Sequence, residues 1–142
     1  MSKDPVIVEV KVRAPVQAVW DAYTSPEHVV NWNFASEDWH CPSAACDLRT
    51  GGRFVSRMEA RDGSSGFDFE GVYTKVERNV RIEYEFGGRT ATVDFVPLND
   101  LTLLRVAFEP EEEFPREIQY AGWQSILNNF ARYISRMYVL AA

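Results

Sequence analysis

Three side chains that could bind a metal or exchange electrons lie close together in the chain, at His40, Cys41 and Cys46. A structural zinc site has four nitrogen or sulfur ligands, usually in closely spaced pairs. Only three are present here, and the adjacent His40 and Cys41 cannot easily turn toward one ion. A redox disulfide usually has the pattern Cys-x-x-Cys at a helix N-terminus, but four residues separate these cysteines and Pro42 is among them. We therefore expect a loop with two free thiols, no metal site and no cofactor.

The sequence also lacks the patterns of nucleophilic or acid–base catalysis. The run DGSSG at 62–66 is not a Gly-x-Ser-x-Gly elbow and falls in an expected hairpin turn. The glycine pairs at 51–52 and 87–88 indicate turns rather than a phosphate-binding loop. Paired carboxylates for acid–base catalysis should face the interior, and none falls on the expected inward face. We therefore assign no catalytic residue.

The run DLRTGG at 47–52 has the residues of a structured loop. We expect Asp47 to accept hydrogen bonds from loop amides and Arg49 to form a bidentate ion pair. Gly51 and Gly52 permit a turn into the next strand, and Gly52 is the position where we expect a positive φ angle. A catalytic role for Asp47 is the less favoured alternative.

The composition suits one globular domain. The chain has 142 residues, of which 46% are hydrophobic, and we expect a single domain over residues 1–142. No run of about 18 apolar residues is present, so we expect no membrane insertion. The charged N-terminus is unlike a signal peptide, which favours a cytoplasmic location. The net charge is −6 and the basic residues are scattered singly, so we expect no nucleic-acid partner.

Alternation of apolar and polar residues predicts an antiparallel sheet with one buried face. We expect six strands, at 6–13, 53–60, 67–76, 81–86, 87–97 and 101–109. Residues 33–50 show no period, and we expect this long segment to be irregular.

Helical spacing predicts two short helices between the first and second strands, and one long helix at the end. Pro15 suits the start of the first short helix, and Pro26 starts a second that runs to about Trp32. The long helix should run from near Phe114 to Tyr138, about six turns. Its apolar face consists of Trp123, Ile126, Leu127, Phe130, Ile134 and Met137. Together these elements predict an α+β fold in which a curved sheet wraps around the long helix.

This order of elements, with these residues, resembles the helix-grip fold of the START-like (SRPBCC) superfamily. More narrowly, it resembles the family named for the activator of the Hsp90 ATPase. The resemblance is carried by APVQAVWDAYTSPEHVVNW, DLRTGGRF, FEGVYTKV and GWQSILNNFARYI, and covers nearly the whole chain in the right order. The co-chaperones that gave the family its name have an additional N-terminal Hsp90-binding domain, whereas Val6 already begins the first expected strand. The family name is therefore not taken as a function.

The resemblance implies a hydrophobic cavity between the sheet and the long helix, in a superfamily that includes lipid carriers, hormone receptors and polyketide cyclases. The expected inward side chains are mostly aromatic with a few hydroxyls, which suits an apolar pocket, although a filled core would use the same residues. The predicted ligand-binding residues are Trp32, Phe34, Met58, Phe69, Tyr73, Tyr84, Phe86, Phe95, Phe108, Gln119, Gly122, Trp123 and Leu127. Trp32, Phe34 and Trp39 form either a lid or anchors for the irregular segment.

Three functions follow from these features. The favoured one is binding of a small hydrophobic or aromatic ligand without catalysis. The second is an enzyme of the polyketide cyclase type that uses Tyr73 or Tyr84 as an acid or hydrogen-bond donor. The third is an Hsp90-related protein-interaction module. Association as a homodimer stays open.

Overall fold

The computed structural model describes residues 4–141, with side chains for residues 4–137. The elements are β1 (Val6–Val12), α1 (Val16–Thr24), α2 (Pro26–Val29), β2 (Trp39–Cys46), β3 (Arg53–Ala60), β4 (Gly66–Glu77), β5 (Arg81–Phe86), β6 (Arg89–Leu98), β7 (Leu101–Phe108) and α3 (Arg116–Ala141). Among these helices, none within residues 4–141 has the length and apolar character that a membrane crossing requires.

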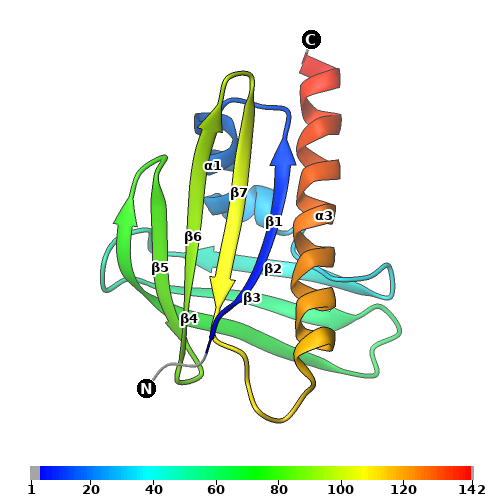
Figure 1. Ribbon diagram of the computed structural model, residues 1–142. Coiled ribbons are helices and arrows are strands. Elements are labelled where there is room, and N and C mark those ends of the chain that lie inside the picture. Colours follow the sequence, from blue (N-terminus) through cyan, green and yellow to red (C-terminus); the bar gives the residue numbers. More distant parts are fainter. Residues whose placement is uncertain (1–3, 142) are drawn as a thin grey trace.

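The strands form one antiparallel sheet in the order β1-β7-β6-β5-β4-β3-β2. Figure 1 shows that β2, β3 and β4 run across the direction of β1, β6 and β7, so the sheet curls, and that α3 lies alongside β1. The predicted architecture of a curved sheet around a C-terminal helix is confirmed. The predicted number of strands, six, is wrong, because the sheet has seven.

The additional strand is β2, within the segment that we expected to be irregular. It is an edge strand that pairs only with β3, and the register shifts between His40 and Ser43. Proline has no N–H to donate and is therefore confined to edge strands and bulges. Pro42 lies in this bulge, which explains how the edge strand accommodates a proline and why the sequence shows no regular alternation there.

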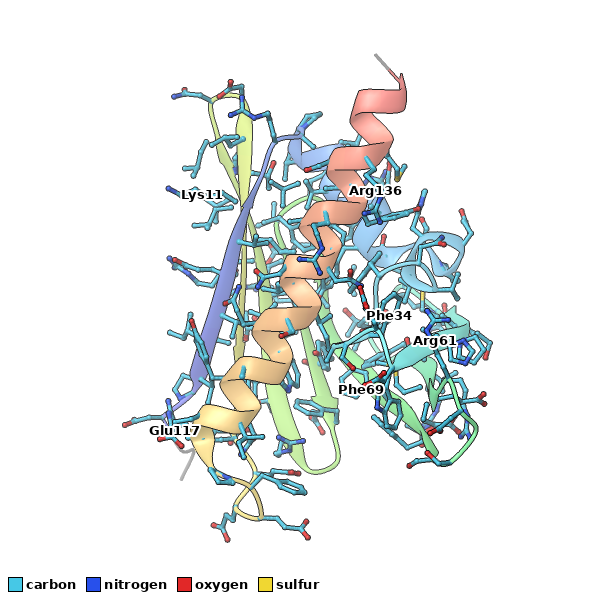
Figure 2. All side chains as sticks on the ribbon, turned by 90° about the vertical axis from the view of Figure 1, so that its right-hand side faces the viewer. Lys11, Phe34, Arg61, Phe69, Glu117 and Arg136 are labelled. Carbon is cyan, nitrogen blue, oxygen red and sulfur yellow. The ribbon has the colours of Figure 1, made fainter. Side chains whose placement is uncertain are left out.

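The core lies between the concave face of the sheet and α3. Leu127, Phe130 and Ile134 of α3 are at most 2% exposed, as the predicted apolar face requires. Ile118, in the first turn of α3, is 61% exposed and lies outside this buried face. Figure 2 shows that Lys11 projects from β1 away from α3. The sheet therefore buries one face only.

The loop between β2 and β3 has two glycines with different roles. Gly51 has a positive φ of 86°, whereas Gly52 does not. The expectation of a positive φ at Gly52 is therefore wrong, and the reason for this glycine is steric. A Cβ atom at Gly52 would overlap the carbonyl oxygen of Asp47. Asp47 forms an exposed ion pair with Nε of Arg49, at 2.8 Å.

This loop also holds the neighbouring strand. The N–H of Gly51 donates to the carbonyl of Tyr73 at 2.7 Å, and the N–H of Tyr73 donates to the carbonyl of Gly52 at 2.9 Å. The loop therefore fixes the backbone of β4 at a residue whose side chain is buried on the concave face.

Candidate functional site

A pocket lies between the concave face of the sheet, α1, the segment after α2, and α3. Its volume is about 320 Å³, within the range of roughly 300–1,000 Å³ that small-molecule sites occupy. It is lined by Tyr23, Thr24, Pro26, Val29, Trp32, Asn33, Ala44, Ala45, Cys46, Phe54, Ser56, Met58, Phe67, Phe69, Tyr73, Ile82, Tyr84, Arg89, Val106, Trp123, Ile126 and Leu127. Most of these side chains are apolar or aromatic, and the polar ones are few.

Seven of the thirteen predicted ligand-binding residues line this pocket. They are Trp32, Met58, Phe69, Tyr73, Tyr84, Trp123 and Leu127. They come from the segment after α2, from three neighbouring strands and from α3. Figure 2 shows Phe69 beside α3.

The other six predicted residues do not line the pocket. Phe86, Phe95 and Phe108 are at most 4% exposed and belong to the packed core. Phe34 lies beside the guanidinium of Arg61, with Cζ 6.0 Å from its ring centroid (Figure 2).

The two remaining predicted residues lie at the start of α3. The side chain of Gln119 is bonded to the chain before the helix, where its amide accepts from the N–H of Glu111 and donates to the carbonyls of Glu111 and Phe114. The space beside Gly122 is empty, because a Cβ atom at this position would meet nothing within 4 Å. Gln119 therefore has a structural role, and Gly122 makes no close approach to the sheet.

Trp32 anchors the segment after α2. Its indole stacks on the ring of Tyr23, with centroids 5.0 Å apart, and its Nε1–H donates to the carbonyl of Ala22 at 3.0 Å. The amide of Asn129 donates to the carbonyl of Trp32 at 2.8 Å. Trp32 is only 3% exposed, which fits an anchor and not a lid. Trp39, the third aromatic residue of that segment, belongs to β2 and contacts the ring of Phe67.

Aromatic rings form a continuous wall on the sheet side of the pocket. The ring of Phe54 lies 5.1 Å from that of Tyr73 and 5.0 Å from that of Tyr84, measured between centroids. Gly71 on β4 makes room for Phe54, because a Cβ atom at Gly71 would lie 2.9 Å from the Phe54 ring. Trp123 meets this wall from α3, with its centroid 6.1 Å from that of Phe69.

Three tyrosines supply most of the hydroxyl groups of the pocket. Burial raises the pKa of Tyr23, Tyr73 and Tyr84 above the ordinary value of 10. Each hydroxyl is therefore neutral at physiological pH and can donate one hydrogen bond. Tyr23 and Tyr84 line the pocket from α1 and β5.

Cys46 is bonded at the edge of the pocket. Its thiol donates to the carbonyl of Thr24 at 3.2 Å. Cys41 is buried and donates to the carbonyl of Ser43 at 3.4 Å. Burial raises the pKa of both thiols, and both cysteines are free. In the part of the chain that the structure describes, no three His, Cys, Asp or Glu side chains form a group that could hold a metal.

A family model described as "Activator of Hsp90 ATPase homolog 1-like protein" matches residues 13–135. The chain belongs to this family. The resemblance that the sequence motifs indicated is thereby confirmed.

Solved structures share the fold with this member of the Hsp90-activator-like family. The AHSA1-like protein from Aeromonas hydrophila is 37% identical, with a TM-score of 0.86, over 92% of this chain and 93% of that one. Chr148 from Cytophaga hutchinsonii is 43% identical, with a TM-score of 0.81, over 96% and 95%. Protein NE0264 from Nitrosomonas europaea is 18% identical with a TM-score of 0.82, over 96% and 97%, which shows the fold alone. No curated protein matches the chain.

Sequence reasoning missed several pocket residues in this family member, and Arg89 is the most important. Arg89 is the first residue of β6, and alternation from Ala91, Val93 and Phe95 places it on the same face. These three residues are at most 3% exposed on the concave side, so the alternation predicts a basic side chain on an apolar surface. Tyr23 and Val29 were missed because strand alternation says nothing about where α1 and α2 pack.

Proposed function

We propose that this protein binds a small, mostly apolar molecule between the concave face of the sheet and α3, without changing it chemically. The observation that carries the proposal is the pocket of about 320 Å³ whose walls are aromatic and aliphatic. A few inward hydroxyls would orient such a ligand by hydrogen bonds. The helix-grip fold, which occurs in lipid carriers and hormone receptors, supports the same function.

The composition of the pocket favours binding over catalysis. In the described part of the chain, the pocket has no Asp or Glu among its lining residues. Tyr73 and Tyr84, the tyrosines considered as acids, have a raised pKa because they are buried. A group whose pKa lies far above the working pH is a weak proton donor in a reaction. Both can still act as hydrogen-bond donors to a ligand.

Filling the pocket tests the proposal. Ala44 lines the pocket from β2 and pairs with Ser56, which also lines it. Ala44→Phe should therefore occupy the space of the ligand. Ser43→Phe is the matched control, because Ser43 is exposed, is the adjacent residue and does not line the pocket.

The measurement is a fluorescence titration with N-phenyl-1-naphthylamine (NPN), a neutral apolar probe. The wild type and Ser43→Phe should bind NPN with the same affinity, and Ala44→Phe should bind at least about tenfold more weakly. Ala44→Phe should still unfold cooperatively, since overpacking a filled core costs about 1–3 kcal/mol and this site is not filled. Absence of saturable binding to the wild type, or equal binding by Ala44→Phe, would refute the proposal.

A further inference from the structure

We propose that the ligand carries one anionic group, a carboxylate or sulfonate, and that Arg89 binds this group at the end of the pocket near Trp123. The inference rests on the proposed function, because it names the chemical class of the ligand in the same pocket. It assigns a role to a charged side chain that the packing of an apolar core does not require.

Arg89 lies where the fold should have an apolar residue. It pairs with Phe86 across β5 and β6, and its side chain is 24% exposed on the concave face. It is the only Lys or Arg among the pocket-lining residues of the described chain. A charged group in a mostly apolar pocket is costly unless an anion or several hydrogen-bond acceptors satisfy it.

The bonds that Arg89 forms leave its charge only partly satisfied. One Nη donates to the backbone carbonyl of Glu109 at 3.0 Å, and Cζ lies 4.4 Å from the ring centroid of Phe86. The other Nη is 3.7 Å from a carboxylate oxygen of Glu111, which is too long for a hydrogen bond. Among the described residues, the guanidinium therefore has an ion pair with Glu111 and acts at longer range on the carboxylate of Glu109, but neither of these carboxylates lies within hydrogen-bond distance of it.

Three other arginines of the sheet have shorter ion pairs than Arg89 does. On the outer face, Arg57, Arg81 and Arg105 each have a carboxylate oxygen within 2.9 Å of Nε. Those pairs are cross-strand or near-neighbour contacts on a solvated surface. Arg89, whose side chain is more buried than theirs, has the longest ion pair of the four, and it also lines the pocket.

Tyr84 adds a second donor near the same place. It is 7% exposed and lines the pocket, and it pairs with Ala91, two residues from Arg89 on the same face of β6. The charge of Arg89 acts on this hydroxyl, opposing in part the effect of burial on its pKa. An anion placed between the two could accept from the guanidinium and from the phenol, and charge-assisted hydrogen bonds of this kind are the strong ones.

Glu111 is then an internal competitor for the ligand's anionic group. Its backbone is held by the side chain of Gln119 through two hydrogen bonds of 2.9 Å. Its carboxylate is 35% exposed and can turn to solvent when a ligand anion arrives. Removing this carboxylate should therefore strengthen binding of an anionic ligand and leave a neutral ligand unaffected.

Two probes with the same ring system test the inference. 1-Anilinonaphthalene-8-sulfonate (ANS) differs from NPN only by its sulfonate. We expect Arg89→Met, which keeps the apolar stem, to weaken ANS binding about tenfold or more and to change NPN binding by less than about twofold. Arg89→Lys should restore part of the loss. Glu111→Gln should tighten ANS binding and leave NPN binding unchanged.

The outcomes separate the two proposals. If neither probe binds the wild type, the proposed function fails. If NPN binds the wild type but Arg89→Met weakens the binding of both probes equally, the inference fails. Arg89 then has only a structural role, through its hydrogen bond to the carbonyl of Glu109. Should Arg89→Met not fold, Glu111→Gln decides, because equal affinity for ANS in this variant and the wild type would overturn the inference. Circular dichroism of each variant confirms that the folded protein is being measured.

Discussion

The indole of Trp123 lies flat against the ring of Phe108, with ring centroids 3.9 Å apart and ring planes inclined by 14°. Phe108 ends β7 and is fully buried, whereas Trp123 also lines the pocket. Trp123 in addition contacts Phe86, over whose ring Arg89 lies. The stack therefore fixes α3 against the sheet at the end of the pocket that we assign to the anionic group.

Loss of this stack should destabilise the whole fold. Phe108→Ala removes a fully buried ring and should lower the free energy of unfolding by about 3–5 kcal/mol. Phe114→Ala is the matched control, because Phe114 is 51% exposed, and its effect should be within about 0.5 kcal/mol. Urea unfolding of the three proteins measures both values. Similar losses in the two variants would contradict the packing described.

The glycine loop between β2 and β3 makes a second stability prediction. A Cβ atom at Gly52 overlaps the Asp47 carbonyl, so Gly52→Ala should cost more than about 1 kcal/mol through forced backbone shifts. At Gly122 on α3, a Cβ atom meets nothing within 4 Å. Gly122→Ala should stabilise the helix by up to about 1 kcal/mol. Thermal unfolding should show opposite shifts, and equal shifts would disprove the steric argument.

Most of the fold could be predicted from alternation and helical spacing, but β2 could not. The segment WHCPSAAC has small residues, a proline and a bulge, and each of these hides the period of two that identifies a strand. What forms the strand is pairing with β3, a contact between segments that the local sequence does not reveal.

The pocket was predicted in part for the same reason. Met58, Phe69 and Tyr84 follow from strand alternation once the concave face is known. The same alternation includes Phe86 and Phe95, which pack in the core instead, because the period of a strand does not show where along the face the sheet and α3 separate. Arg89 could have been found, since it continues the alternation of β6 onto the concave face.

The buried tyrosines predict a loss of stability at alkaline pH. Burial raises the pKa of Tyr23 and Tyr84 above 10, so the folded state keeps both neutral while the unfolded chain ionises. Their contribution is complete below about pH 10 and falls as pH rises toward the folded-state pKa, by up to about 1.4 kcal/mol per pH unit for each. Tyr84→Phe should make this decline shallower. Urea unfolding from about pH 8 to about pH 11 measures the slope, and an unchanged slope in the variant would contradict the burial of this phenol.

The two cysteines should differ in their reaction with iodoacetamide. Burial raises the pKa of both thiols, and the thiolate is the reactive form, so both should react slowly at neutral pH. Cys46 lines the pocket, whereas Cys41 is 3% exposed and does not. Mass spectrometry should find Cys46 modified first, and NPN should slow that modification. Earlier reaction of Cys41, or no protection of Cys46, would argue against a ligand beside Cys46.

The most direct test of the central claim is to locate a bound apolar probe. Nuclear Overhauser effects between the protons of NPN and labelled methyl groups report contacts inside the complex. Ile126 and Leu127 of α3 line the pocket, whereas Ile7 and Ile118 are 51% and 61% exposed on the surface. We predict contacts from NPN to Ile126 and Leu127 and none to Ile7 or Ile118. Contacts to the exposed methyl groups alone would show that the probe binds the surface and that the pocket is not the ligand site.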